Sequence, residues 1–137
     1  MKKQVLIVSS SLSTGGLEKC LIDFCNSLDY DKYDVDLYLF NEGRDLLPQL
    51  NKNVHLLPES PLYNDVYNVS FLKSLKALLK KKQYRLFFYR IKRIFKSRFR
   101  ISTFTKKDWQ SMKKTMLRLE KEYHSAIGFE EQTSCYY

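Results

Sequence analysis

Glycine, proline and cysteine are scarce in this chain of 137 residues, which contains 4 Gly, 3 Pro and 3 Cys. So little glycine and proline excludes a collagen-like chain and a linker-rich one. The apolar runs are only a handful of residues long, so none can cross a bilayer as a helix. The run Val5–Val8 near the amino terminus is also too short for a signal-peptide core. With 44% hydrophobic and 28% charged residues, the chain is expected to form one globular domain or part of one.

The cysteines do not form a metal-binding or disulfide pattern. There are three cysteines, Cys20, Cys25 and Cys135, and no two of them form a Cys-x-x-Cys pair. An odd number without such a pair disfavours a disulfide framework and a zinc knuckle. We expect reduced thiols in a cytoplasmic protein, with Cys20 and Cys25 as small core residues. Neither His55 nor His124 has a Cys, Asp or Glu at ligand spacing. Both histidines are therefore expected to be structural, and no metal is expected.

Acidic residues are absent from residues 71–107, a segment that carries 14 Lys or Arg. The remainder of the chain holds 10 basic and 15 acidic residues, so the net charge of +9 comes from this one basic block. A block of a single sign predicts an anionic partner, such as lipid headgroups, nucleic acid or an acidic protein surface.

Aromatic and aliphatic residues interleave with the basic ones at helical spacing. Such a helix can lie in the interface of an anionic membrane. The alternative is a solvated helix that packs over the sheet, with Lys and Arg reaching out to water. We expect a membrane surface rather than nucleic acid. The basic residues expected to contact it are Lys80, Lys81, Lys82, Arg85, Arg90, Lys92, Arg93 and Lys96.

Strand and helix patterns alternate along the chain. Residues 4–9 are a continuous apolar run, residues 34–40 alternate, and residues 54–57 and 125–129 are short apolar segments. Apolar residues at helical spacing fill residues 17–28 between the first two. This order predicts an α/β fold, a partial Rossmann-like parallel sheet of about four strands with flanking helices. The basic helices are expected to form an insertion over about residues 68–122.

A small polar loop ending in Gly15 and Gly16 joins the first strand to the first helix. Thr14 is a candidate N-cap, and Glu18 places a negative charge in the first turn. Amides at a helix N-terminus attract phosphate, and this loop follows the carboxyl end of a strand, where open α/β sheets bind ligands. The alternative is a tight turn that needs glycine for its conformation. The loop lacks both the dinucleotide fingerprint and the P-loop sequence.

Three segments resemble the family 4 glycosyltransferases, which are retaining enzymes of the GT-B fold. The first is Val5–Lys19, an apolar strand and a Ser-rich loop followed by Gly-Gly-x-Glu-Lys. The second is Leu28–Val35, similar to the family's helix exit and second strand, and the third is Tyr123–Glu130, similar to its Tyr-Asp-x-Ala-Ile-Gly-Phe strand. The resemblance covers the two ends of the chain and is poor over residues 60–122.

The resemblance implies a function and a set of site residues. The chain would be the N-terminal, acceptor-side half of an enzyme that transfers a sugar from a nucleotide-sugar donor to a lipid-linked or saccharide acceptor. Gly15 and Gly16, with Thr14 and Glu18 of the same motif, would lie near the donor diphosphate. Glu130 and Glu131 would lie on the acceptor side of the same rim. The synthesis of surface polysaccharide at the inner face of the membrane is the expected setting.

The chain also departs from the family's pattern. The family has a second Rossmann-like domain with a Glu-x7-Glu pattern that binds the donor, and 137 residues cannot contain both domains. We therefore expect this chain to be inactive alone. It would be a truncated reading frame, an isolated domain of a longer protein, or one half of a split enzyme whose partner is a separate C-terminal half. The alternative from another class is a non-catalytic membrane-binding module that uses the basic helices.

Overall fold

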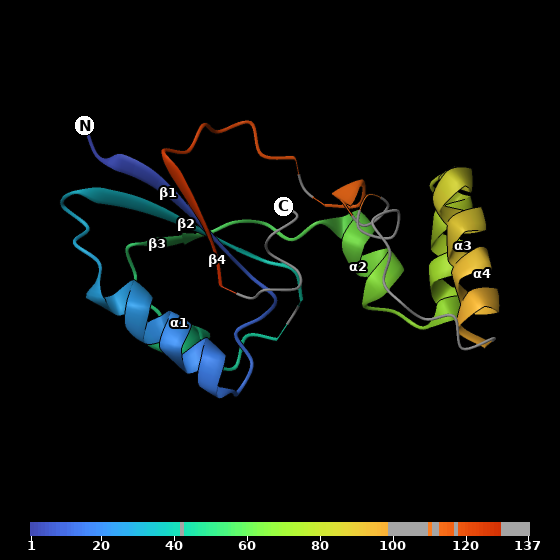
Figure 1. The fold of residues 1–137 in the computed structure, drawn as a ribbon, viewed down its shortest axis with the longest axis horizontal. Helices are drawn as coiled ribbons and strands as arrows, with labels where there is room; N and C mark the ends of the chain where they lie inside the picture. The colour runs from blue at the N-terminus through green and yellow to red at the C-terminus, as the bar shows by residue number, and fades with distance from the viewer. Residues whose placement is uncertain (42, 99–109, 111–112, 117, 130–137) are drawn as a thin grey trace. The chain divides into compact units, whose positions relative to one another are not determined.

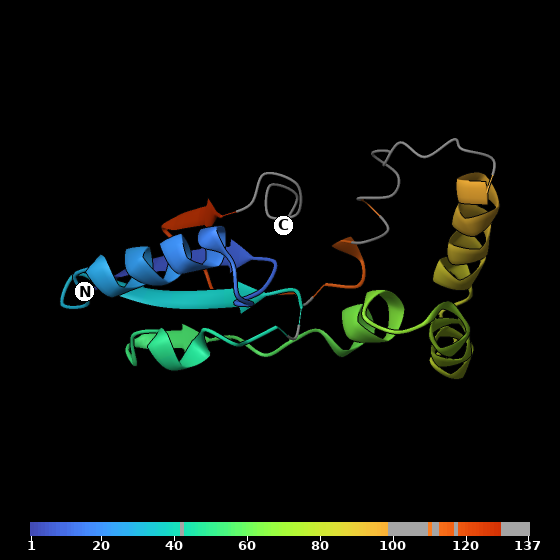
Figure 2. The same ribbon diagram turned by 90° about the horizontal axis from the view of Figure 1, so that it is seen from below.

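The computed structural model describes residues 1–41, 43–98, 110, 113–116 and 118–129. Its elements are β1 (Lys3–Ser9), α1 (Gly16–Ser27), β2 (Tyr33–Leu39), η1 (Leu47–Gln49), β3 (Val54–Leu56), α2 (Pro61–Tyr67), α3 (Phe71–Lys80), α4 (Tyr84–Arg98) and β4 (Ser125–Gly128). Figure 1 and Figure 2 show these elements from two directions. Within the described residues, no helix combines the length and the apolar character needed to cross a membrane.

The chain divides into two compact units. Residues 1–59 and 118–137 form the first, which we call the sheet unit, and residues 60–117 form the second, which we call the helical unit. The helical unit is inserted between β3 and β4 of the sheet unit.

The sheet unit contains four parallel strands in the order β3-β2-β1-β4. β1 pairs along its whole length with β2, from Lys3 opposite Tyr33 to Ser9 opposite Leu39. Parallel strands need crossover connections, and α1 supplies the one between β1 and β2. The predicted α/β class and parallel sheet of about four strands are confirmed.

The core of the sheet unit lies between α1 and one face of the sheet, two layers that are seen side by side in Figure 1. Alternate residues of a strand point to the same face, so β1 and β2 contribute every second side chain to this layer. α1 adds three buried side chains at helical spacing. The buried members are Val5, Ile7, Leu12, Leu21, Ile22, Cys25, Val35, Leu37, Leu39 and Val54.

Two residues of the first helix differ from the prediction. Cys20 is exposed, so its predicted role as a core residue is wrong, while Cys25 is fully buried. The buried residues of α1 are Leu21, Ile22 and Cys25, and Cys20 lies outside this buried face of the helix. Thr14 is not the N-cap, because the helix begins at Gly16 and its N-cap is Gly15, with no side-chain capping bond.

The helical unit has a small core of its own. Val66, Leu78 and Leu86, one from each of α2, α3 and α4, are buried together. The N-cap of α2 is Ser60, whose Oγ accepts from the amide of Tyr63 and donates to the carbonyl of Thr115. Because this core is small, much apolar surface of α3 and α4 remains exposed.

Candidate functional site

The glycine loop, residues 10–16, lies at the carboxyl end of β1. In the strand order β3-β2-β1-β4, the chain moves outward from β1 to one side first and later returns to its other side with β4. The position between β1 and β4 is therefore the topological switch point, where open α/β sheets bind their ligands. The loop leads directly into α1, whose 12 residues give its N-terminus a substantial dipole.

Backbone bonds from a neighbouring loop hold the glycine loop in place. Leu12 is fully buried, its amide donates to the carbonyl of Gly43 at 2.7 Å, and its carbonyl accepts from Leu46 at 2.9 Å. The amide of Asn41 donates to the carbonyl of Ser10 at 2.7 Å. These bonds fix the loop before any ligand binds, which lowers the entropic cost of binding.

The two loop glycines are not needed for their backbone conformation. Gly15 is extended, with a φ of −165°, and no glycine in the described part of the backbone has a positive φ. At Gly16, a Cβ atom would meet nothing within 4 Å. A tight turn that requires glycine therefore does not explain this pair. Open space above a helix N-terminus instead leaves room for a ligand to approach the backbone.

The Glu18 carboxylate lies over Gly15. A Cβ atom at Gly15 would overlap Oε2 of Glu18, so this side chain folds back onto the start of its own helix. Glu18 occupies the third helical position, from which a carboxylate reaches the N-cap in a capping box. The carboxylate therefore stabilises the helix start and would have to move aside for a phosphate.

Ser9 is a buried polar residue at this end of the sheet. Its side chain is 1% exposed, and its Oγ has no hydrogen-bond partner. Ser9 has the same parity along β1 as Val5 and Ile7, which pack on α1, so its hydroxyl lies on the helix side of the sheet. An unpaired buried hydroxyl costs free energy.

The acceptor-side residues predicted from the resemblance are Glu130 and Glu131. Both lie outside the described residues. The strand that leads to them is described, and Phe129 at its end donates its amide to the carbonyl of Val8 at 2.9 Å.

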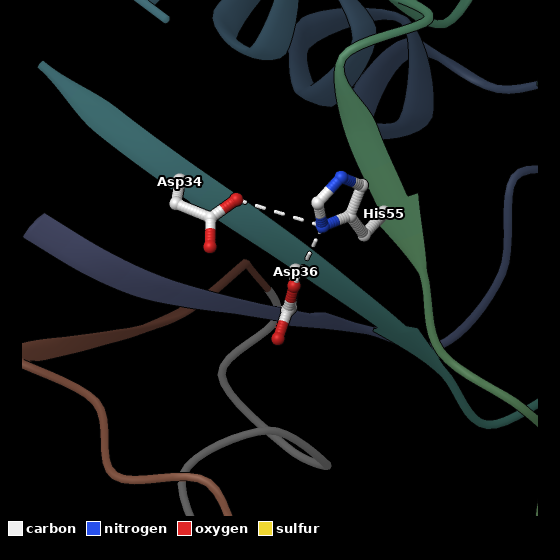
Figure 3. A group of neighbouring side chains, drawn as sticks. All are labelled: Asp34, Asp36 and His55. Carbon is white, nitrogen blue, oxygen red and sulfur yellow. Dashed lines mark ion pairs between the residues drawn. The ribbon is translucent and has the colours of Figure 1, made fainter. Parts of the chain in front are cut away.

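A second group of polar side chains, drawn in Figure 3, lies on the face of the sheet that does not pack against α1. This group is near the amino-terminal ends of the strands. Asp34 and Asp36 of β2 point to the same side, and His55 of β3 pairs directly with Asp36. His55 Nδ1 lies 3.5 Å from Asp34 Oδ1 and 3.4 Å from Asp36 Oδ1. The spacing of residues along the chain gave no sign of these two acidic neighbours, because the pairing of β2 with β3 brings them to His55.

The other carboxylate oxygens of the two aspartates accept from the segment that precedes β4. Lys121 Nζ lies 2.9 Å from Asp36 Oδ2 and 3.3 Å from Asp34 Oδ2, and the Tyr123 hydroxyl donates to Asp36 Oδ2 at 2.6 Å. Asp36 is 3% exposed, so these bonds replace the water that its charge has lost.

The same contacts shift two pKa values. Burial would raise the pKa of Asp34, but hydrogen bonds from Lys121 and Gln4 outweigh it and lower that pKa. Burial would lower the pKa of Lys121, but its bonds to Asp36 and Asp34 outweigh it and raise that pKa. Both shifts favour the charged forms, so the pair is an ion pair at neutral pH.

Asp34, Asp36 and His55 lie close enough together to bind one metal ion. Their possible ligand atoms all lie within 4.8 Å of one another. Oxygen and imidazole ligands of this kind suit a divalent cation. Lys121 already neutralises the two carboxylates, and a cation would compete with it. The contacts of Lys121 with Asp34 and Asp36 form an ion-pair network that ties the segment before β4 to β2.

The predicted membrane-contact residues lie on α3, on α4 and in the turn between them. Lys81 also pairs with Asp65 of α2. Arg90 is partly buried and stacks over the ring of Tyr67 at 5.6 Å. Arg93 is also partly buried, and the side chain of Lys96 lies outside the described residues. Those with exposed side chains are Lys80, Lys81, Lys82, Arg85 and Lys92.

Comparisons of the chain with protein-family profiles, with curated proteins and with solved structures find no match. The fold class is therefore defined by the structure itself: an open, all-parallel, Rossmann-like α/β sheet with four strands in the described residues. The resemblance to family 4 glycosyltransferases rests on the three sequence segments alone.

Proposed function

We propose that this chain is the N-terminal, acceptor-side half of a GT-B glycosyltransferase. The parent reaction transfers a sugar from a nucleotide donor to a lipid-linked or saccharide acceptor during surface or capsular polysaccharide synthesis. In this proposal the chain works in the cytoplasm, peripheral to the inner face of the membrane, together with a donor-binding domain. Alone it is inactive.

One observation carries the proposal: the glycine pair opens the helix that follows β1, at the switch point of a parallel sheet. Neither glycine is required by its φ, and the space above Gly16 is open. A diphosphate at this place would accept hydrogen bonds from the first amides of α1 and interact favourably with the helix dipole. The unpaired hydroxyl of Ser9 is a further donor on the same side of the sheet.

The roles in the proposed site divide between the two groups on the rim. The backbone amides at Gly15 and Gly16 bind the donor diphosphate, and Glu130 and Glu131 contact the acceptor. Glu18 supports the helix start and turns aside when the diphosphate binds. No metal is required, because the helix N-terminus supplies the positive potential.

The binding step is tested by titrating the 15N-labelled chain with inorganic diphosphate and with uridine diphosphate. We expect amide shifts in residues 9–17 and none in the distant group at Asp34 and Asp36. Gly16→Val fills the open space without a clash and should weaken binding at least tenfold, or by about 1.4 kcal/mol. Cys20→Ala, an exposed change later in the same helix, is the matched control. A ligand concentration of about 10 mM detects even very weak binding. An absence of shifts at that concentration would contradict the proposed diphosphate site.

The catalytic step is tested on the two halves together. The genomic DNA beyond codon 137 is sequenced for a second Rossmann-like domain with Glu-x7-Glu, in this frame or a shifted one. That domain is then expressed with this chain and assayed for transfer from a mixture of nucleotide sugars. Transfer that needs both halves and is lost in Gly16→Val supports the proposal. An absence of transfer when the two halves are combined would contradict it.

A further inference from the structure

Helix α4 exposes a row of large apolar side chains in addition to those it packs inside its own unit. Tyr84, Phe88 and Phe95 are 54%, 66% and 65% exposed. Their spacings of four and seven residues place them on one face of the helix, and Ile94, 40% exposed, lies at its border. Large aromatic side chains in one exposed row are unusual for a solvated helix, since scattered single residues are the normal case.

The side of α4 that faces its own unit carries polar groups. Leu86 is buried there with Val66 and Leu78, but Arg90 is also turned inward, over the ring of Tyr67. Nε of Arg90 and the hydroxyl of Tyr89 are buried without a hydrogen-bond partner. The helix thus keeps an arginine and a tyrosine inside while its apolar row faces out, which indicates that the outer row meets a partner of its own.

Positive charge surrounds this row. Arg85 and Lys92 are exposed and follow Tyr84 and Phe88 on one border of the row. Helix α3 repeats the pattern, because Leu72 is 71% exposed and Leu79 is 47% exposed among exposed lysines. No Asp or Glu occurs in residues 71–107. The exposed lysines of α3 are Lys73, Lys76 and Lys80.

We infer that α3 and α4 dock the chain on an anionic lipid bilayer. Tyr84, Phe88 and Phe95 enter the headgroup region, while Arg85 and Lys92 remain at the level of the lipid phosphates. Leu72 and Leu79 of α3 add a second apolar contact. The inference deepens the proposed location at the membrane and rests on that part of the proposed function, but it uses no residue of the glycine loop.

Charge and shape favour lipid over the other anionic partners. A second copy of the same face would bring two unbroken sets of lysine and arginine together, which is repulsive. Nucleic acid would pair with the basic side chains, and its bases could stack on the aromatic rings. It would not bury the exposed aliphatic side chains of Leu72, Leu79 and Ile94. A bilayer interface accepts aromatic, aliphatic and basic groups together.

The test is flotation of the whole chain with vesicles. One set is pure phosphatidylcholine, and the other contains about 30 mol% phosphatidylglycerol to supply negative surface potential. Each basic residue near such a surface contributes about fivefold, so Arg85→Gln with Lys92→Gln should lower the partition coefficient about 25-fold. The matched control is Lys2→Gln with Lys52→Gln, two exposed lysines of the sheet unit, which should change it less than about twofold because they lie outside the contact.

The apolar row has a separate variant. Phe88→Ser with Phe95→Ser keeps every charge and changes two exposed side chains, so the circular dichroism melting curve should stay close to that of the parent. Binding to the anionic vesicles should still fall at least tenfold. This second variant separates insertion into the interface from attraction by charge alone.

Three results would overturn the inference. They are equal flotation with both vesicle types, an equal loss in the sheet-unit control, and self-association or oligonucleotide binding that depends on Phe88 while vesicle binding does not. Loss of vesicle binding with intact diphosphate shifts would end the membrane inference alone. Intact vesicle binding without diphosphate shifts would end the donor-site proposal and leave the membrane-binding module as the function.

Discussion

At the scale of single residues, burial divides the two described cysteines. Cys25 is fully buried in α1, and burial raises the pKa of its thiol to about 11. Cys20, only five residues earlier, is exposed. Because the thiolate is the reactive form, burial and a raised pKa should both slow the reaction of Cys25.

Alkylation measures this difference directly. With iodoacetamide at pH 8, we expect Cys20 to react at least 100 times faster than Cys25, which must wait for unfolding. Peptide mapping of the modified sites distinguishes them, and alkylation in denaturant, where both react alike, is the control. Equal rates in the folded protein would mean that α1 is not packed on the sheet as described.

The raised pKa of Cys25 also sets a sign for stability at alkaline pH. A folded pKa above the unfolded one means that this group stabilises the fold fully below the unfolded pKa of about 8.5. That contribution is lost as the pH rises through the folded value of about 11. Burial likewise raises the pKa of Tyr30 to about 12. Both groups therefore weaken the fold in alkaline solution.

The ion pair between Lys121 and the two aspartates gives a second prediction. Lys121→Met removes the cation and leaves the carboxylate of Asp36 buried with fewer partners, at a cost of about 1–2 kcal/mol near neutral pH. Asp34 has a lowered pKa and so stabilises the fold above about pH 4, with loss as the pH falls further. Lys121 has a raised pKa and stabilises the fold below about pH 10, with loss above it.

Urea unfolding of both proteins at several pH values checks this. The difference in the free energy of unfolding should be constant between about pH 5 and 9 and should shrink below about pH 4 and above about pH 10. Lys52→Met, at an exposed lysine, is the control and should show no such profile. A difference that does not vary with pH would show that Lys121 acts through packing of its alkyl chain.

At the scale of elements, one residue at the end of α3 adopts a backbone conformation that is unfavourable for its residue type. Lys82 has a φ of 55°, in the left-handed region. Its amide donates to the carbonyl of Leu79 at 3.0 Å, and the amide of Gln83 donates to that of Leu78 at 2.9 Å. These two bonds define a Schellman motif, in which glycine is the usual residue at the position of Lys82.

Lys82→Gly should therefore stabilise the helical unit. Relief of the left-handed conformation is worth about 1–2 kcal/mol, and the greater freedom of glycine in the unfolded chain offsets part of it, so we expect a net gain of about 0.5–1 kcal/mol. Lys82→Ala removes the same charge without relieving the conformation and is the matched control. Thermal unfolding followed by circular dichroism measures both, and equal melting temperatures would refute the prediction.

The elements also show how far the sequence predicts the structure. All four strands and α1 follow from apolar periodicity, since burial on a sheet or a helix imposes that pattern. Helix α2 is not among the elements predicted from the sequence. Pro61 lies at its first position, after the cap Ser60, where proline is favoured.

The two candidate sites differ in the same respect. The glycine loop could be placed from sequence, because its position after β1 is itself the signal. The group formed by Asp34, Asp36 and His55 could not, because it exists only through the pairing of β2 with β3. The alternation Asp34-Val35-Asp36 was the available sign that one face of this strand carries charge.

At the scale of the whole molecule, charge divides along the same line as the two units. The sheet unit has 8 basic and 13 acidic residues, whereas the helical unit has 16 basic and 2 acidic residues. An anionic surface attracts the helical unit and not the sheet unit. In the docking that we infer, this charge would steer the approach and the apolar row of α4 would enter the interface after contact.

Salt separates these two contributions. Raising the ionic strength from about 0.05 to 0.5 M shortens the Debye length from about 14 to 4 Å, so attraction by the basic residues should fall at least tenfold in vesicle flotation. Insertion of Tyr84, Phe88 and Phe95 is not screened, so the parent chain should keep measurable binding in high salt. The Phe88→Ser, Phe95→Ser variant should keep none. If that variant and the parent lose binding in parallel, attraction by charge accounts for all of it, and the exposed row of α4 is covered by something other than lipid.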